Sequence, residues 1–95
     1  MNLKEIQLLS LKESKTLLER CVKLQEESGE LAEQILIAAK ASGSQRKKAS
    51  IQGIKEEAAD VLLVALSIFF KDGGTIAELK KLLSEKAKKW KKYQK

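Results

Sequence analysis

The chain has 95 residues, no proline and only four aromatic side chains. Its abundant leucine, alanine, lysine and glutamate favour helix throughout, so we expect one all-α domain over residues 1–95. With one cysteine and no histidine, the sequence excludes a disulfide framework, a Cys/His zinc site, a Ser-His-Asp triad and a Cys-His pair. Any chemistry must therefore use carboxylates, lysines and a metal.

The formal net charge of +6 is confined to the C-terminal segment. Residues 1–75 carry eleven basic and eleven acidic side chains, whereas residues 76–95 carry eight lysines against Glu78 and Glu85. Such a run is usually a solvated helix face, although it would also attract an anionic partner.

The sequence gives no sign of secretion or membrane insertion. Met1 to Glu5 lack the basic-then-apolar profile of a signal peptide. The longest uncharged run, Val61 to Phe70, is about half of a membrane span. We expect a cytoplasmic protein without a membrane partner.

Two helices are predicted in the first half of the chain. The first runs from about Asn2 to Leu11 as a short packing helix. The second runs to about Ala41, and both Ser10-x-x-Glu13 and Thr16-x-x-Glu19 fit the capping box that would open it. We place its start at Thr16.

The second helix carries an apolar stripe that we expect to face the core. At about 100° per residue, Glu27 lies at its edge and Glu30 about 60° further round. We therefore expect Arg20, Lys23 and Gln34, on the same flank, to be neighbours of anything bound there. The stripe comprises Leu17, Cys21, Leu24, Leu31 and Ile35, widened by Leu18, Ala32 and Leu36. We interpret Cys21 as a small buried hydrophobic residue.

A turn is predicted at Ser42-Gly43-Ser44, followed by a basic connection, Arg46-Lys47-Lys48. The third helix lies within about Ser50 to Lys71, and its stretch Val61–Phe70 is apolar on nearly every side. A 95-residue monomer can hardly cover such a helix. We therefore expect an oligomeric core in a homodimer or homotetramer.

The last predicted helix follows Asp72-Gly73-Gly74, whose glycines can adopt the left-handed cap. Thr75-x-x-Glu78 is a second capping box. The predicted fold is thus a bundle of about four helices built on an antiparallel helical hairpin.

Two acidic pairs stand out against this background. Glu27 with Glu30, and Glu57 with Asp60, are each three residues apart, so each pair projects from one helix face. Their common midpoint falls between residues 43 and 44, at the predicted turn. Folding there brings all four carboxylates together. Because two like charges 4 Å apart repel by about 4 kcal/mol at an effective dielectric near 20, we expect a cation among them. The alternative for the first pair is an ordinary surface contact between Lys23 and Glu27.

These residues resemble the MazG-type, all-α nucleoside triphosphate pyrophosphohydrolases, a superfamily that also includes dimeric dUTPases. The family pattern is E-x-x-E, a gap, then E-x-x-D. It is met by Glu27-Ser28-Gly29-Glu30 and Glu57-Ala58-Ala59-Asp60, with 26 residues between them. The flanks, residues 23–33 and 56–62, are similar as well, and the resemblance covers roughly residues 20–93. E-x-x-E alone is weak, since Glu30-x-x-Glu33 also fits it.

The resemblance implies that Glu27, Glu30, Glu57 and Asp60 bind Mg²⁺, and that a nucleoside triphosphate is split into the monophosphate and pyrophosphate. Mg²⁺ prefers oxygen ligands and keeps several waters, so it can bridge carboxylates to phosphates. Either Glu27 or Glu30 would act as the base. Candidates for the nucleotide contacts are Lys23, Lys86, Lys89 and Trp90.

The candidate nucleotide contacts in the last predicted helix depart from the family pattern. Many members carry Asn followed by Arg residues where this chain has Lys88-Lys89-Trp90-Lys91-Lys92-Tyr93. Trp90 would stack on a base or, equally, close the core. Two alternative functions stay open: a nucleic-acid-binding helical module that uses the lysine-rich end, and an oligomeric bundle with neither activity.

Overall fold

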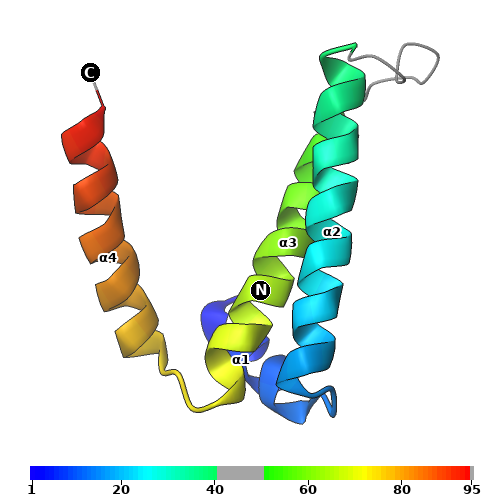
Figure 1. Ribbon diagram of the computed structural model, residues 1–95. Helices are drawn as coiled ribbons and strands as arrows, with labels where there is room; N and C mark the ends of the chain where they lie inside the picture. The colour runs from blue at the N-terminus through cyan, green and yellow to red at the C-terminus, as the bar shows by residue number, and fades with distance from the viewer. Residues whose placement is uncertain (41–50, 95) are drawn as a thin grey trace.

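The computed structural model describes residues 1–40 and 51–94. Within these ranges the chain forms four α-helices and no strand, as the sequence predicts (Figure 1). The predicted turn at Ser42-Gly43-Ser44, the basic connection Arg46-Lys47-Lys48 and Ser50 lie outside the described residues. The helices are α1 (Leu3–Lys12), α2 (Leu17–Ala38), α3 (Ile51–Lys71) and α4 (Ile76–Tyr93).

Side chains at the helix N-termini satisfy backbone N–H groups that the helices leave unpaired. The Thr16 hydroxyl accepts from the Glu19 N–H at 3.1 Å, and the Glu19 carboxylate accepts from the Thr16 N–H at 3.0 Å. The hydrogen bond from the Thr16 N–H to the carboxylate is the main cause that lowers the pKa of Glu19. Thr75 and Glu78 repeat the arrangement at α4. The start predicted for the second helix is therefore confirmed.

The C-terminal end of α2 comes earlier than the sequence suggested. The helix ends at Ala38, and Lys40 takes a φ of 54°, in the left-handed region. The N–H of Lys40 then bonds to the carbonyl of Ile37 at 3.0 Å. A residue in this conformation closes a helix, so α2 ends about three residues before the predicted boundary, and Ala41 itself lies outside the described residues.

α2 and α3 lie side by side and run in opposite directions, forming the helical hairpin of the fold (Figure 1). α1 packs mainly on α3. The buried apolar cluster lies where α1, α3 and the start of α4 meet. It contains Leu66, Phe70 and Leu79, with Leu3, Ile6, Phe69 and Ile76 packed around them.

Two glycines set the course of the chain from α3 to α4. Gly73 has a φ of 92°, which only glycine adopts without strain. A side chain on Gly74 would collide with the carbonyl oxygen and ring of Phe69. Beyond the buried Leu79, every described residue of α4 is exposed, and the helix diverges from the hairpin (Figure 1).

The prediction of which α2 face packs inward holds only in part for the single chain, because Leu24 and Leu31 are half-buried but the rest of the stripe is exposed. Leu17, Leu18 and Cys21 are exposed, with Leu18 74% accessible. The buried residues of α2 are instead Arg20, Glu27 and Ile37. Of these three residues, Arg20 bonds to α3 through the Ser67 carbonyl, and Glu27 faces the carboxylates of α3.

α3 remains partly uncovered as well. Leu66 and Phe70 are buried, whereas Leu62 and Leu63 are 59% and 45% exposed. The chain by itself does not cover the apolar stretch that suggested an oligomeric core. Within the described ranges, none of the helices has the length and apolar character needed to cross a membrane.

Candidate metal centre

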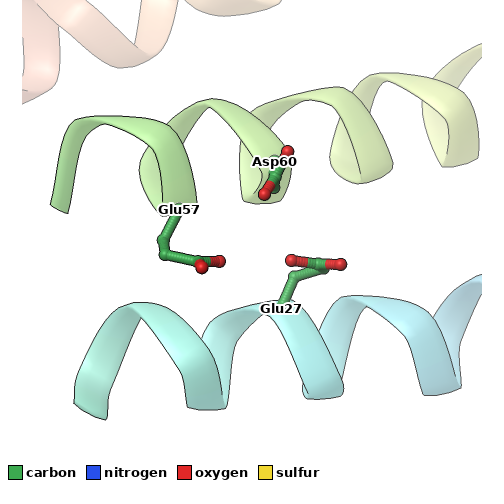
Figure 2. Close-up of side chains that lie close together, drawn as sticks. All are labelled: Glu27, Glu57 and Asp60. Atoms are coloured by element: carbon green, nitrogen blue, oxygen red, sulfur yellow. The ribbon is translucent and has the colours of Figure 1, made fainter. Parts of the chain in front are cut away.

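Three of the four predicted carboxylates face one another in the middle of the hairpin. Glu27 projects from α2, and Glu57 and Asp60 project from α3 on the opposite side of the gap (Figure 2). One carboxylate oxygen from each lies within 4.8 Å of the others. The antiparallel pairing of the helices therefore brings together residues about thirty positions apart in sequence, as the motif spacing predicts.

The three side chains differ in their access to solvent. Glu27 is buried, Glu57 is half-buried and Asp60 is exposed. A carboxylate on a helix face that packs against a neighbouring helix loses water, and burying a charge is costly unless it is paired. The centre is thus closed on the α2 side and open at Asp60, the side from which a ligand can enter.

Two of the buried oxygens have no hydrogen-bond partner in the part of the chain that the structure describes. Glu27 is 7% exposed; its Oε1 accepts from Lys23 Nζ at 3.0 Å, but its Oε2 has no hydrogen-bond partner among the described residues. Glu57 Oε2 is also buried and likewise has no hydrogen-bond partner among the described residues. An unsatisfied charged group of this kind costs more than a neutral one, so both oxygens are suited to a positively charged ligand.

Glu30, the fourth predicted carboxylate, lies beside the cluster and is exposed. The negative charge of Glu27 is the main cause that raises the pKa of the Glu30 carboxyl, followed by partial desolvation and the charge of Glu57. A protonated Glu30 can also donate to the carboxylates of Glu57 and Glu27, which acts in the same direction. Like charges at close range disfavour ionisation, which is why the neighbouring carboxylates raise this pKa.

Lys23 is the cation paired with this cluster. Its ammonium lies 3.0 Å from Glu27 Oε1 and 3.9 Å from Glu26 Oε1. The hydrogen bond to Glu27, then the charges of Glu26 and Glu27, raise the pKa of Lys23. The predicted alternative, a Lys23–Glu27 contact, is therefore present, but its carboxylate is buried rather than on the surface. One ammonium cannot neutralise several carboxylates.

Arg20 does not have the expected role as a neighbour of the ligand. Its side chain is 1% exposed and donates to four backbone carbonyls, from Nε to Lys15 at 3.0 Å and from Nη1 to Ser67 at 2.8 Å. Nη2 donates to Ser10 and Glu13, each at 3.0 Å. The guanidinium therefore ties the end of α1 and the α1–α2 connection to α3.

The predicted contacts from the last helix are not brought to the cluster within this chain. Lys86, Lys89 and Trp90 are exposed on α4, which contacts α1 but diverges from the hairpin (Figure 1). Trp90 is 70% exposed, so it does not close the core. Of the four candidate nucleotide contacts, Lys23 alone lies at the centre.

The structure also reveals a site component that the sequence did not indicate. Glu13 and Lys15, in the connection between α1 and α2, line a cavity that includes Arg20 and Lys23. A connection has no periodic pattern to mark its inward-facing residues. The one available signal was Ser10-x-x-Glu13, the alternative capping box for the second helix, which placed Glu13 near a helix end.

Comparisons with known proteins add no relative. No protein-family model matches this sequence, and neither a curated protein nor a solved structure gives a significant match. The likeness to the MazG-type family therefore rests on the two acidic motifs and their flanks.

Proposed function

We propose that the protein is a Mg²⁺-dependent pyrophosphohydrolase of the MazG type. It would split a nucleoside triphosphate, or its deoxy form, into the monophosphate and pyrophosphate, for example to remove unwanted nucleotides from the cellular pool. The observation that carries the proposal is the convergence of Glu27, Glu57 and Asp60 from two helices, with two buried oxygens that have no partner within residues 1–40 and 51–94.

The donor set fits a hard divalent cation. All the candidate ligands are carboxylate oxygens, which Mg²⁺ prefers, and Asp60 leaves the centre open to waters and phosphates. Glu27, Glu57 and Asp60 would hold the ion, with Glu30 beside them. When bound, Mg²⁺ would neutralise negative charge on the phosphate oxygens and lower the pKa of a bound water.

The remaining groups have complementary roles. Lys23 lies at the edge of the cluster, where its ammonium can bind a phosphate oxygen. One carboxylate oxygen of Glu27 accepts from Lys23 and the other is buried, whereas the Glu30 side chain is exposed. We therefore assign the proton from the attacking water to Glu30. The water oxygen bonds to the α-phosphorus, the bond from that phosphorus to the bridging oxygen breaks, and pyrophosphate leaves with the electron pair.

The test is pyrophosphate release from a panel of ribo- and deoxyribonucleoside triphosphates, with Mg²⁺ and with a chelator. We expect turnover of at least one nucleotide, only with the metal. Glu30→Gln and Asp60→Asn should each lower the rate by about 100-fold or more. Glu26→Gln and Glu56→Gln are matched controls, because each removes an exposed carboxylate next to a motif residue. No turnover of any nucleotide would contradict the proposal.

The oligomeric state belongs to the same proposal. Exposed apolar side chains lie on several helices, including Leu18, Leu62 and Trp90 at 74%, 59% and 70%. Large apolar surfaces usually mark interaction sites, and these support a homodimer or homotetramer. Sedimentation velocity at micromolar concentration should give two or four chains per particle; a monomer would contradict this part.

A second candidate function is supported by α4. Its lysines are exposed along the described helix, so they are accessible to DNA or RNA. Binding would weaken steeply as salt rises, through counterion release, and truncation after Leu83 should abolish it. Failure to retain any nucleic acid at low salt would exclude this function.

A further inference from the structure

Lys23 places a positive charge at one edge of the acidic cluster. Its ammonium lies 3.0 Å from Glu27 Oε1 and 3.9 Å from Glu26 Oε1. Both partners belong to its own helix, α2, whereas Glu57 and Asp60 reach the cluster from α3. The buried Oε2 atoms of Glu27 and Glu57 have no hydrogen-bond partner in the described part of the chain. Lys23 therefore satisfies the edge of the cluster but not the buried oxygens between the two helices.

The pair of Lys23 and Glu27 has features that make it replaceable by a stronger cation. The lysine precedes the glutamate by four residues, which is the less favourable order for such a pair on a helix. The Lys23 side chain is 41% exposed, and ion pairs close to solvent contribute little to stability. A divalent ion carries twice the charge of an ammonium and binds oxygens from several carboxylates at once.

The two cations cannot share the Glu27 carboxylate at low cost. The ammonium is bound to Oε1, and the oxygen that is free for an ion is Oε2 of the same group. Cations on the two oxygens of one carboxylate are close to each other, and their repulsion doubles when one of them is divalent. This repulsion favours departure of the ammonium from Glu27 when the ion binds.

Lys23 has room to move when it leaves Glu27. Its side chain borders a cavity of about 180 Å³, and its flexible four-carbon stem can change rotamer without repacking the core. Val64, one helical turn after Asp60 on α3, lines the same cavity. Because Asp60 is the exposed member of the cluster, the moved ammonium stays near the side on which the centre is open.

We infer that Lys23 is a counter-cation that leaves Glu27 when a divalent ion binds the cluster, and that its freed ammonium then binds an oxygen of the phosphate chain. The inference rests on the proposed function, because it takes the cluster to bind Mg²⁺. It adds a coupling between the two ligands, since binding of the ion releases the group that holds the anion.

The first test is calorimetric titration of Mg²⁺ into the full-length protein without nucleotide. Lys23→Met removes the competing charge and keeps most of the side-chain length, so it should tighten Mg²⁺ binding by about tenfold. Lys23→Arg keeps the charge and should bind Mg²⁺ no tighter than wild type. Lys55→Met is the matched control, because it removes an exposed lysine two residues before Glu57. At physiological salt it should change the affinity by less than about twofold.

The second test is binding of inorganic tripolyphosphate at saturating Mg²⁺, when the centre is loaded in every variant. Lys23→Met lacks the ammonium for the phosphate oxygen, so its affinity for tripolyphosphate should fall about tenfold while its Mg²⁺ affinity rises. Lys55→Met should bind tripolyphosphate as wild type does. A general loss of structure would weaken both ligands, and the dispersion of the amide spectrum checks that each variant is folded.

The outcomes separate this inference from the proposed function. Weaker Mg²⁺ binding by Lys23→Met would show that the lysine holds Glu27 in place for the ion. Equal effects of Lys23→Met and Lys55→Met would show an ordinary ion pair, and unchanged tripolyphosphate binding would show that Lys23 does not hold the anion. Each of these results overturns the exchange and leaves the proposed function standing. If the wild-type protein binds no Mg²⁺, both proposals fail.

Discussion

The hairpin of α2 and α3 and the diverging helix α4 carry their charges in opposite ways. In the hairpin, Arg20 and Glu27 are buried with specific partners, and Lys23 is hydrogen-bonded to Glu27. On α4, every described residue beyond Leu79 is exposed, including its lysines. The segment with the highest net charge, α4, is thus the one whose charged side chains have the fewest fixed partners among the described residues.

This contrast separates charge that serves solubility from charge that serves a site. Burying an ionised group costs several kcal/mol unless partners offset it, so a chain retains buried charges only where they position something. Exposed charges cost little and contribute little. We therefore expect substitutions of the buried or clustered charges of the hairpin to have large and specific effects and those of the exposed charges, including all the lysines of α4, to have small ones.

The largest effect is expected for Arg20→Met. The change keeps much of the side-chain volume but leaves the carbonyls of Ser10, Glu13, Lys15 and Ser67 without their donor. We expect the free energy of unfolding to fall by about 3–5 kcal/mol in urea denaturation. Lys55→Met, which removes an exposed cation from α3, should change it by less than about 0.5 kcal/mol. Similar small effects for both would refute the contrast.

The next effect concerns the acidic cluster. Glu57→Gln removes one of the crowded charges, so in chelator it should raise the free energy of unfolding by about 1 kcal/mol. The wild-type melting temperature should rise with Mg²⁺, because a ligand that binds the folded state stabilises it. The variant should lose most of that rise, whereas Glu56→Gln should keep it. A Mg²⁺ response that survives in Glu57→Gln would speak against a metal at this centre.

A smaller effect is expected from pH in metal-free protein. The raised pKa of Glu30 means that the folded state keeps this proton above 4.5, the ordinary value, while the unfolded state loses it. The associated stability is complete below 4.5 and is lost as pH rises through the folded pKa. Glu30→Gln should remove this decline, so the difference in stability between wild type and variant should change as the pH rises above the ordinary value of 4.5.

The matched control for the pH series is Glu26→Gln, which should keep the decline. Lys23 does not contribute in this window, because its raised pKa lies above its ordinary value of 10.5. Its stabilising contribution is complete below that value and is lost only as pH rises through the folded pKa. A parallel pH dependence in wild type and Glu30→Gln would show that Glu30 is not crowded.

The smallest effect is expected on α4. Lys88→Ala and Lys92→Ala each remove an exposed charge, and we expect the free energy of unfolding to change by less than about 0.5 kcal/mol. Urea denaturation of the full chain measures this. A loss above about 1 kcal/mol would mean that these lysines are buried in an assembly of several chains, and α4 would then resemble the hairpin.

The sequence was most informative where a local rule determines structure. The capping boxes at Thr16 and Thr75 and the left-handed Gly73 follow from contacts within a few residues, and all three are present. The meeting of Glu27 with Glu57 and Asp60 was also predictable, because equal spacing about a turn fixes which residues of a hairpin lie level.

The packing of α2 was not predictable in the same way. Its apolar residues suggested that Leu17 and Cys21 face inward, yet Arg20 and Glu27 do. A hydrophobic pattern shows which face avoids water, not whether the same chain covers that face. The partners of Arg20 are backbone carbonyls, which no sequence pattern marks.

The uneven distribution of the apolar core has a mechanical consequence for the hairpin. Leu66, Phe70 and Leu79 anchor one end, whereas toward the opposite end Ile37 is the buried apolar residue of α2. Separation of the two helices should thus start at that opposite end, and amide protons there should exchange first. The carboxylates lie partway along the hairpin, between its two ends. A bound cation would therefore hold the two helices together in the less stable half and slow their separation there.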